Sequence, residues 1–393
     1  MEAERDMVGE LTVSMRALLA GARRSLGEMV ALTGRLVEAE SPSDNKVAVD
    51  ASVALAAEEA RAQGGRVKLH RQRGWGDVLE VRFGPRTKQA KAGRAMLLGH
   101  LDTVWPVGTL KTMPLKQAEG RLAGPGVLDM KTGVAMGLTA LRLLEEAELL
   151  EREVVLLLNG DEEVGSPGSR PITEKLAQEC AAVYVLEPAQ GLAVKTARKG
   201  TGSFRLDVTG VAAHAGVDFE KGASALRELA RAIETVSGWT DLKRGLTVSV
   251  GLAGGGSKTN VVPDRAWAEV DVRIRRKGDG ARIERRFAGL KAEDKRCTVT
   301  VRGGIDRPPM ERTRATVRLY QRARMLAAEM GIDLAEAATG GASDGNLTSA
   351  LGIATLDGLG AVGEGAHARH EHVVLAELPV RTALLAGLLA GGA

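Results

Sequence analysis

The stretch Met96-Leu97-Leu98-Gly99-His100-Leu101-Asp102-Thr103 is an apolar run that stops at a histidine and an aspartate two residues apart. A histidine after a strand is often a hydrogen-bonded structural residue, so this stretch alone is a weak signal. However, ligands in open α/β sheets bind beyond the carboxyl ends of the strands. We therefore expect a buried strand here that delivers two polar side chains to the edge of a sheet.

The same pattern occurs twice more downstream. The run Val154-Val155-Leu156-Leu157-Leu158 opens into Asn159-Gly160-Asp161-Glu162-Glu163, and Val183-Tyr184-Val185-Leu186 ends at Glu187. Short apolar runs rich in β-branched residues and bounded by turn residues are typical of buried strands. If the three strands are parallel, their polar ends lie at one edge of the sheet. Carboxylates gathered there repel one another and are costly to desolvate, so we expect a cation beside them.

Length and composition indicate a multidomain globular protein. The chain has 393 residues, which suggests two or three domains, and 44% hydrophobic with 26% charged residues is ordinary. The formal net charge of +4 could suggest nucleic acid. Basic residues are interleaved with acids, however, and stacking aromatics do not accompany them, so nucleic-acid binding is not expected.

Location and redox chemistry follow from three simple observations. The two cysteines, Cys180 and Cys297, have no metal-ligand or CxxC spacing, and we interpret both as buried apolar residues. The chain begins without the basic and apolar regions of a secretory signal. Because no window reaches 18 uninterrupted apolar residues, we expect no membrane span and a cytoplasmic location.

Periodicity divides the chain into two kinds of structure. Helical spacing is found within residues 8–38, 44–63, 134–146, 317–330 and 376–389, with strands expected at 67–69, 78–83, 96–99, 154–158, 183–186 and 353–356. Between them, strands at 204–211, 246–253, 266–274 and 298–302 and helices at 221–236 and 280–290 give a β-α-β-β-α-β order, which indicates a ferredoxin-like insert. We therefore expect one domain from residues 1–193 and 309–393, and a second from 194–308.

Asp129 lies just before the helix expected at 134–146. One interpretation is an N-cap carboxylate that accepts hydrogen bonds from free backbone N–H groups. The other is a ligand, because Gly124, Gly126 and Gly133 allow an unusually close approach of the backbone. The residues alone leave both open.

Several short motifs, in their order and spacing, give the chain a family resemblance over nearly its whole length. The sequence resembles the M20 family of metallopeptidases, most closely its glutamate carboxypeptidase-like branch. The motifs are Gly99-His100-Leu101-Asp102-Thr103-Val104-Trp105, Gly124-Pro125-Gly126-Val127-Leu128-Asp129-Met130-Lys131, Asp161-Glu162-Glu163-Val164-Gly165, Leu186-Glu187-Pro188, Ala213-His214-Ala215-Gly216, Thr259-Asn260-Val261-Val262-Pro263, and His367 four residues before Glu371.

The resemblance implies an α/β fold like that of zinc exopeptidases: a mixed sheet flanked by helices, with the inserted α+β domain acting as a lid and as a dimerisation domain. It also implies two Zn²⁺ ions, with Co²⁺ or Mn²⁺ as alternatives. Asp129 would bridge the ions, His100 and Glu187 would complete one site, and Glu163 and His367 the other. Three protein ligands per ion are typical of catalytic zinc.

Further roles are implied for residues near these ligands. Glu162 would be the general base. Asp102 would accept the second N–H of His100 and fix its tautomer. His214 would reach the active site of the partner subunit in a homodimer and stabilise the developing oxyanion. The family usually has asparagine at His370 and an aromatic residue at His372, and we interpret these two histidines as part of a solvated loop.

Substrate contacts are implied for a set of lid and loop residues that would face a free carboxylate: Lys199, Asn260, Arg273, Arg307, Gly341 and Ser343. A surface ion pair is the alternative for each basic member. The expected activity is hydrolysis of an amide next to a free carboxylate, by a carboxypeptidase that releases an amino acid such as glutamate. An N-acyl-amino-acid deacylase or dipeptidase is the alternative, and an inactive metal-binding scaffold is a more remote one, because every position of the constellation is filled.

Overall fold

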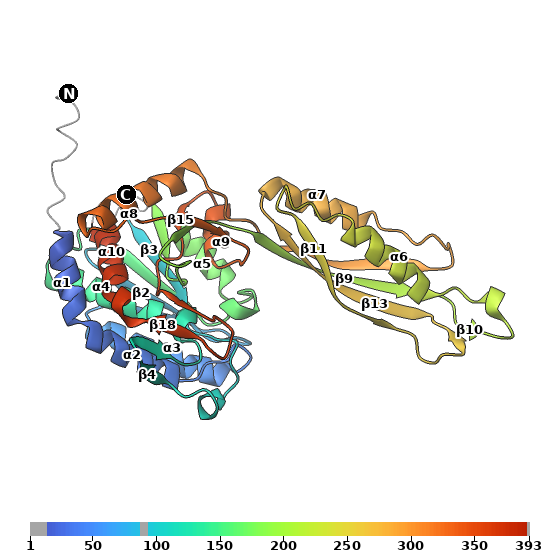
Figure 1. Ribbon diagram of the computed structural model, residues 1–393, viewed down its shortest axis with the longest axis horizontal. Coiled ribbons are helices and arrows are strands. Elements are labelled where there is room, and N and C mark those ends of the chain that lie inside the picture. Colours follow the sequence, from blue (N-terminus) through green and yellow to red (C-terminus); the bar gives the residue numbers. More distant parts are fainter. Residues whose placement is uncertain (1–13, 87–92, 391–393) are drawn as a thin grey trace, which may run out of the picture. The chain divides into compact units, whose positions relative to one another are not determined.

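The computed structural model describes residues 14–86 and 93–390 of the chain (Figure 1). These residues form two compact units. The first contains the residues up to 197, then 312–338 and those from 343 onward; the second contains 198–311 and 339–342. In the described ranges, no helix is long and apolar enough to cross a membrane.

The first unit is built on a six-stranded mixed sheet. Its order is β1 (Arg66–His70), β2 (Val78–Phe83), β6 (Val154–Asn159), β3 (Ala95–His100), β7 (Ala182–Val185) and β16 (Ala354–Leu356). β6, β3, β7 and β16 are parallel, whereas β1 and β2 are antiparallel to their neighbours. The three parallel strands expected from their polar ends are therefore adjacent, with β3 in the middle.

Helices and small sheets complete this unit. The helices are α1 (Met15–Arg24), α2 (Leu26–Glu38), α3 (Lys46–Ala62), α4 (Thr132–Glu146), α5 (Arg170–Ala177), α8 (Arg314–Glu329), α9 (Gly345–Ala350) and α10 (Leu378–Ala390). A second sheet joins β17 (Gly363–Glu364), β18 (His372–Val374), β5 (Arg121–Ala123) and β4 (Lys116–Ala118), and β8 (Val194–Arg198) pairs with β15 (Glu336–Thr339). Short helical turns are η1 (Thr109–Lys111), η2 (Val127–Lys131), η3 (Glu162–Val164) and η5 (Leu375–Glu377).

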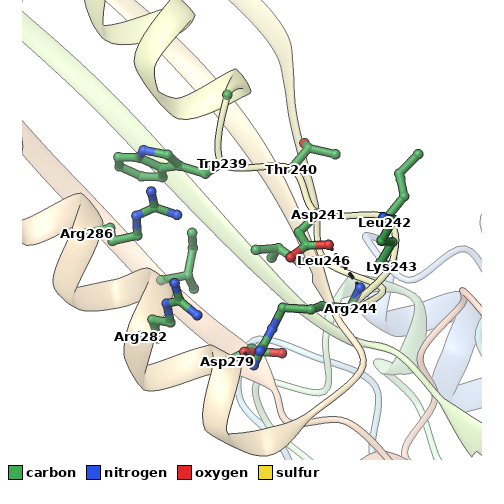
Figure 2. A pocket seen from close by; sticks show the side chains of 12 residues that line it. Trp239, Thr240, Asp241, Leu242, Lys243, Arg244, Leu246, Asp279, Arg282 and Arg286 are labelled. Carbon is green, nitrogen blue, oxygen red and sulfur yellow. Dashed lines mark hydrogen bonds and ion pairs between the residues drawn. The ribbon is translucent and has the colours of Figure 1, made fainter.

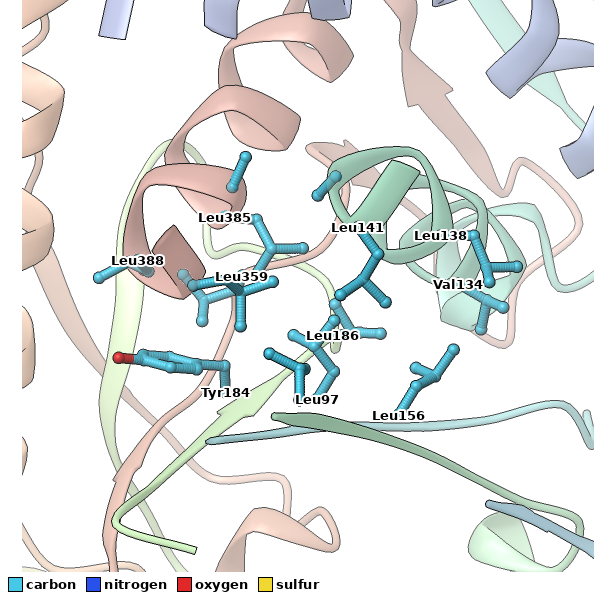
Figure 3. Packing of buried hydrophobic residues seen from close by; sticks show 14 of the residues in the cluster. Leu97, Val134, Leu138, Leu141, Leu156, Tyr184, Leu186, Leu359, Leu385 and Leu388 are labelled. Atoms are coloured by element: carbon cyan, nitrogen blue, oxygen red, sulfur yellow. The ribbon is translucent and has the colours of Figure 1, made fainter. Parts of the chain in front are cut away.

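The strands β3, β6 and β7 of the large sheet are buried on both faces, which explains their continuous apolar sequences. Successive side chains of a strand point to opposite faces. Leu97, Leu156 and Tyr184 thus pack against one layer of helices, whereas Met96 and Val155 pack with residues of α5 on the other face. Figure 3 shows the first of these contacts, made with side chains of α4 and α10, for example Val134, Leu138, Leu141, Leu385 and Leu388.

The second unit has a four-stranded antiparallel sheet of order β11-β13-β9-β14 with helices α6 and α7. Its elements are β9 (Gly200–Thr209), β10 (Ala213–His214), η4 (Phe219–Lys221), α6 (Ala225–Ser237), β11 (Thr247–Gly255), β12 (Val261–Val262), β13 (Arg265–Ile274), α7 (Lys277–Ala288) and β14 (Thr298–Arg307). Apart from the small β10–β12 pair, this is the β-α-β-β-α-β order expected from the sequence. Phe204 of β9 stacks on Phe287 of α7, with ring centroids 3.9 Å apart, within this unit's own core.

Candidate metal centre

His100 is the last residue of β3 and is 2% exposed. Its Nδ1 lies 3.0 Å from the backbone carbonyl of Asp102 and 3.4 Å from that residue's Oδ1. Its Nε2 faces Oδ1 of Asp129 at 3.2 Å and Oε1 of Glu187 at 3.6 Å. One ring nitrogen is thus held by the chain, and the other points into a group of carboxylates. This is the usual arrangement of a histidine that ligates a metal.

Asp129 lies in η2, three residues before α4 begins, and Lys131 is the N-cap residue of that helix. The N-cap interpretation of Asp129 is therefore wrong. The turn needs Gly126, whose φ is +70° and where a Cβ would lie 2.6 Å from the Thr103 side chain. Gly133 allows a close approach of the chain to the strand end that carries Glu187, because a Cβ at Gly133 would lie 2.3 Å from the carbonyl oxygen of Leu186.

Glu162 and Glu163 lie in η3, which begins three residues after the end of β6. The turn is held by Asp102, which is fully buried. Its Oδ1 accepts from the backbone N–H of Glu162 and its Oδ2 from that of Glu163, both at 3.1 Å. Oδ2 also accepts a 2.6 Å hydrogen bond from the hydroxyl of Ser43. Asp102 therefore positions both glutamates, a role broader than the imidazole contact expected for it.

Two groups of potential ligands share Asp129. His100, Asp129 and Glu187 form one, and Asp129, Glu163 and His367 form the other, with ligand atoms within 4.8 Å of one another in each group. In the second group, Nε2 of His367 lies 3.1 Å from Oε1 of Glu163 and 3.4 Å from Oδ2 of Asp129. All five expected ligands are thus brought together within the first unit, from segments far apart in the sequence.

The pKa values of these groups show how strongly the site attracts positive charge. Burial alone would lower the pKa of His100, but hydrogen bonds with Asp102, Asp129 and Glu187 raise it well above its ordinary value. Hydrogen bonds with Asp129 and Glu163 raise the pKa of His367 to about 10. Burial raises the pKa of Glu163 despite its contact with His367. Two imidazoles with three carboxylates form a mixed nitrogen and oxygen donor set, which suits Zn²⁺ and similar divalent ions.

His214 is in the second unit, exposed at the end of β10. Its Nδ1 accepts hydrogen bonds from the backbone N–H groups of Gly216 at 3.1 Å and Val217 at 3.2 Å. An Nδ1 that accepts leaves the proton on Nε2 in the neutral ring. The exposed nitrogen of His214 is therefore a hydrogen-bond donor, as a role in oxyanion stabilisation requires.

Two further residues proposed for substrate contact lie on the second unit with different surroundings. Asn260 is exposed, and its backbone carbonyl accepts from the N–H of Ala215. Arg273 is paired with Asp271 of its own strand: Nε lies 2.9 Å from Oδ1, and Nη2 lies 2.9 Å from Oδ2. A substrate carboxylate at Arg273 would have to compete with this aspartate.

The other proposed substrate contacts are partly engaged within the protein. Arg307 is 4% exposed at the end of β14, and Lys199 is half-buried. The carbonyl of Gly341 accepts from Nη1 of Arg198 at 3.2 Å. Ser343 is fully buried; its N–H donates to Asn346 at 3.0 Å and its hydroxyl to Asp357 at 2.6 Å. The exposed Gly341 is thus better placed than Ser343 to offer a backbone donor.

The two extra histidines near His367 differ from each other. His370 is exposed, as expected for a solvated loop. The same expectation is wrong for His372, which is 8% exposed in β18, with Nδ1 2.9 Å from the carbonyl of His370. Its position in the strand pairing with β5 removes it from solvent.

Sequence reasoning assigned no role to two buried charged residues. Lys131 is 1% exposed and donates to the backbone carbonyls of Leu36 at 2.6 Å and Ala39 at 3.0 Å. Burial lowers its pKa to about 7. Glu371 is fully buried and accepts hydrogen bonds from the turn that carries Asp129. Both lie within or beside the motif strings, but only the fold reveals their contacts.

A cavity of about 470 Å³ lies in the second unit and is lined by residues of that unit. Figure 2 shows it between the segment after α6 and helix α7. The guanidinium of Arg286 lies 4.8 Å from the ring centroid of Trp239, and Nη2 of Arg244 lies 2.6 Å from Oδ1 of Asp279. Because its lining includes no residue of either ligand group, we assign it no part in the chemistry.

The fold and the two ligand groups are those expected of a metallopeptidase. Residues 96–391 match the model of Peptidase family M20/M25/M40. The chain belongs to this family and is a metallopeptidase.

Three known proteins illustrate the relationship. The chain is 29% identical to carboxypeptidase G2 of Pseudomonas sp. (strain RS-16) over 303 residues, which cover 75% of this chain and 72% of that protein. It is 29% identical to succinyl-diaminopimelate desuccinylase of Corynebacterium glutamicum over 260 residues, covering 63% and 67%. Among solved structures, aminopeptidase PepT of Bacillus cereus ATCC 10987 matches with a TM-score of 0.79 at 20% identity, covering 93% and 98%.

Proposed function

We propose that the chain is a carboxypeptidase-type amidohydrolase that cleaves an amide bond next to a free carboxylate and releases a C-terminal amino acid such as glutamate. We also propose that it uses two Zn²⁺ ions, with Co²⁺ or Mn²⁺ as alternatives. The observation that carries the proposal is Asp129, shared between two groups of ligands. Glu162, a carboxylate outside both groups, is the neighbour of the ligand Glu163 in the same turn.

Each residue then has a distinct task. Divalent cations in such a site polarise the amide carbonyl and make a water molecule more acidic. Glu162 takes a proton from the attacking water and passes it to the leaving nitrogen. Asp102 holds Glu162 and Glu163 in place through their backbone N–H groups. His214 donates from Nε2 to the developing oxyanion of a partner subunit's substrate.

Recognition of the free carboxylate is assigned to Asn260, Arg273 and Arg307, with Lys199 and the loop of Gly341 and Ser343. In this proposal, Arg273 must exchange its ion pair with Asp271 for a contact with the substrate carboxylate. In a site shielded from water, a charge-assisted contact with the substrate can replace an exposed ion pair, because exposed pairs contribute only about 0–1 kcal/mol.

Two other readings of the same site are distinguishable from this one. The likeness to a desuccinylase supports N-acyl-amino-acid deacylase activity as the second candidate, and dipeptidase activity belongs with it. An inactive scaffold is disfavoured because both ligand groups and Glu162 are present.

Homodimerisation through the second unit is part of the proposal, because its sheet has edge strands, β11 and β14, available for pairing. The cytoplasmic location remains a prediction.

A substrate panel tests the proposal. Protein reconstituted with Zn²⁺ is given N-acyl-glutamate, N-acyl-alanine, a dipeptide, and the C-terminal amide of each, and the released amine is measured. The proposal requires hydrolysis of the acids and loss of several kcal/mol of transition-state binding for the amides. Equal rates on acid and amide would refute the carboxylate contact. Faster cleavage of the alanine compound would refute only the preference for glutamate.

A further inference from the structure

Glu371 is a fully buried carboxylate in the segment that follows His367. Its Oε1 accepts from the backbone N–H of Leu128 at 2.9 Å and of Asp129 at 3.1 Å. Its Oε2 accepts from the backbone N–H of Gly126 at 3.0 Å and from Nε1 of Trp105 at 2.9 Å. We propose that Glu371 is the positioning residue that fixes the Asp129 turn and thereby sets the geometry of both metal sites.

The number of hydrogen bonds explains why a carboxylate is required. A carboxylate has about four lone-pair positions, two on each oxygen, and carries no proton to donate. Glu371 meets four N–H donors, two at each oxygen. A glutamine has the same shape, but its amide nitrogen would direct N–H groups at two of these donors. A buried N–H left without an acceptor destabilises the folded chain, so the turn would have to move.

Glu371 also connects three segments that carry proposed ligands. Trp105 follows His100 and Asp102 in the loop after β3. The backbone carbonyl of Glu371 accepts from the N–H of Gly124, and its own N–H donates to the carbonyl of Ala368, next to His367. The following strand, β18, pairs with β5, which leads into the Asp129 turn. The loops of His100, Asp129 and His367 are thus held together at one residue, through its carboxylate and its backbone.

This inference rests on the proposed metal site but not on the proposed substrate. Because Asp129 belongs to both ligand groups, a displaced turn weakens both sites together. Loss of a residue that orients a metal ligand typically reduces metal affinity 10–100-fold. Glu371→Gln should therefore bind Zn²⁺ about 10–100-fold more weakly than the wild type, at both sites.

The control is Glu40→Gln, which makes the same chemical change at another loop-holding carboxylate. Glu40 accepts from the backbone N–H of Gly108 at 2.7 Å and of Leu110 at 3.0 Å, at the start of η1, where no residue is a proposed ligand. The full-length proteins are compared by chelator-competition titration with Zn²⁺, by the visible absorption spectrum after loading with Co²⁺, and by hydrogen exchange at the amides of Leu128 and Asp129.

The proposal requires that Glu371→Gln has weaker Zn²⁺ binding, an altered Co²⁺ spectrum and faster exchange at these two amides, while Glu40→Gln matches the wild type. Wild-type affinity and spectrum in Glu371→Gln would overturn it. If Glu371→Gln does not fold, the Zn²⁺ affinity of Trp105→Phe tests the proposal instead, because this variant removes one of the four N–H groups that donate to Glu371. Zn²⁺ affinity no lower in Trp105→Phe than in Glu40→Gln then overturns the proposal. These readouts hold even if none of the proposed substrates is cleaved.

Discussion

Asp102 and Glu163 are joined by a 3.1 Å hydrogen bond, in which the backbone N–H of Glu163 donates to Oδ2 of Asp102. The two residues follow different strands, β3 and β6, which lie side by side in parallel. Oδ1 of the same carboxylate accepts from the N–H of Glu162. One buried side chain therefore sets how far the proposed base and a proposed ligand project beyond the sheet.

Asp102→Asn tests this relationship. The amide nitrogen of asparagine would face a backbone N–H, so one of the glutamates of the turn would shift. We expect kcat/KM to fall about 10–100-fold, as for other residues that orient metal ligands. The comparison is Asp218→Asn, an exposed carboxylate paired with Lys221, which should behave as the wild type. Unchanged kcat/KM in Asp102→Asn would show that the turn does not depend on this carboxylate.

The neighbours Glu162 and Glu163 should respond differently to the same substitution. Glu162→Gln is expected to keep both metal equivalents while turnover falls about 10²–10⁴-fold, the usual contribution of general acid–base catalysis. Glu163→Gln is expected to lose metal as well, because it removes a charged ligand. Metal content by elemental analysis and turnover under metal saturation separate the two effects. Near-wild-type turnover in Glu162→Gln would remove it from the mechanism.

The strands and the edge that carries the site could be predicted because they depend on local patterns. Each apolar run that ended in a polar group became a parallel strand of the large sheet, β3, β6 or β7. A strand buried on both faces must be apolar throughout, so its end is visible where the first polar residue appears. The element order of the second unit was predictable because it also depends on local patterns. In β9 and β13 the buried residues alternate with more exposed ones.

Contacts between distant polar residues could not be predicted. Glu371 meets Leu128 across 243 residues of chain, and Trp105 across 266. No periodicity encodes such a pair. Arg273 illustrates a second limit: the sequence left a surface ion pair open as an alternative, but an arginine two residues from an aspartate in a strand is equally compatible with free and paired side chains, so only the structure shows the pair with Asp271. The N-cap alternative for Asp129 failed because Asp129 lies inside the η2 turn, whereas Lys131 is the N-cap residue of α4.

Cys180 provides a prediction about pH. The thiol is 6% exposed and donates to the carbonyl of Leu176, and burial raises its pKa from 9.0 to about 12. Below pH 9 the thiol is protonated in both folded and unfolded chains, so its contribution to stability is complete. Between pH 9 and 12 only the unfolded chain ionises, and stability falls as pH rises. The expected loss is about 1 kcal/mol from pH 9 to pH 10.

Cys180→Ala isolates this effect. The variant should be less stable at every pH because it leaves a small cavity, but the part of the alkaline decline that is due to the thiol should disappear. Urea unfolding of both proteins at pH 8, 9 and 10 measures the difference in slope. Parallel curves for the two proteins would contradict the raised pKa. The remaining cysteine, Cys297, is present in both and cancels in the comparison.

His214 provides a test of the proposed dimer. Its Nδ1 accepts from two backbone N–H groups, so Nε2 is left as a fixed donor. If this donor acts in the partner subunit's site, His214→Ala and Glu162→Gln are each inactive alone but complement each other when mixed. The hybrid has one site that combines the intact base of one chain with the intact histidine of the other.

Random exchange at equal concentrations makes half of the dimers hybrid, and each hybrid has one intact site of two, so we expect about one quarter of wild-type activity. Subunit exchange is followed independently by fluorescence transfer between labelled chains. A mixture that exchanges subunits and remains inactive would place the action of His214 within its own chain. His214→Gln is a useful companion variant, because its amide N–H can restore part of the donation that alanine cannot.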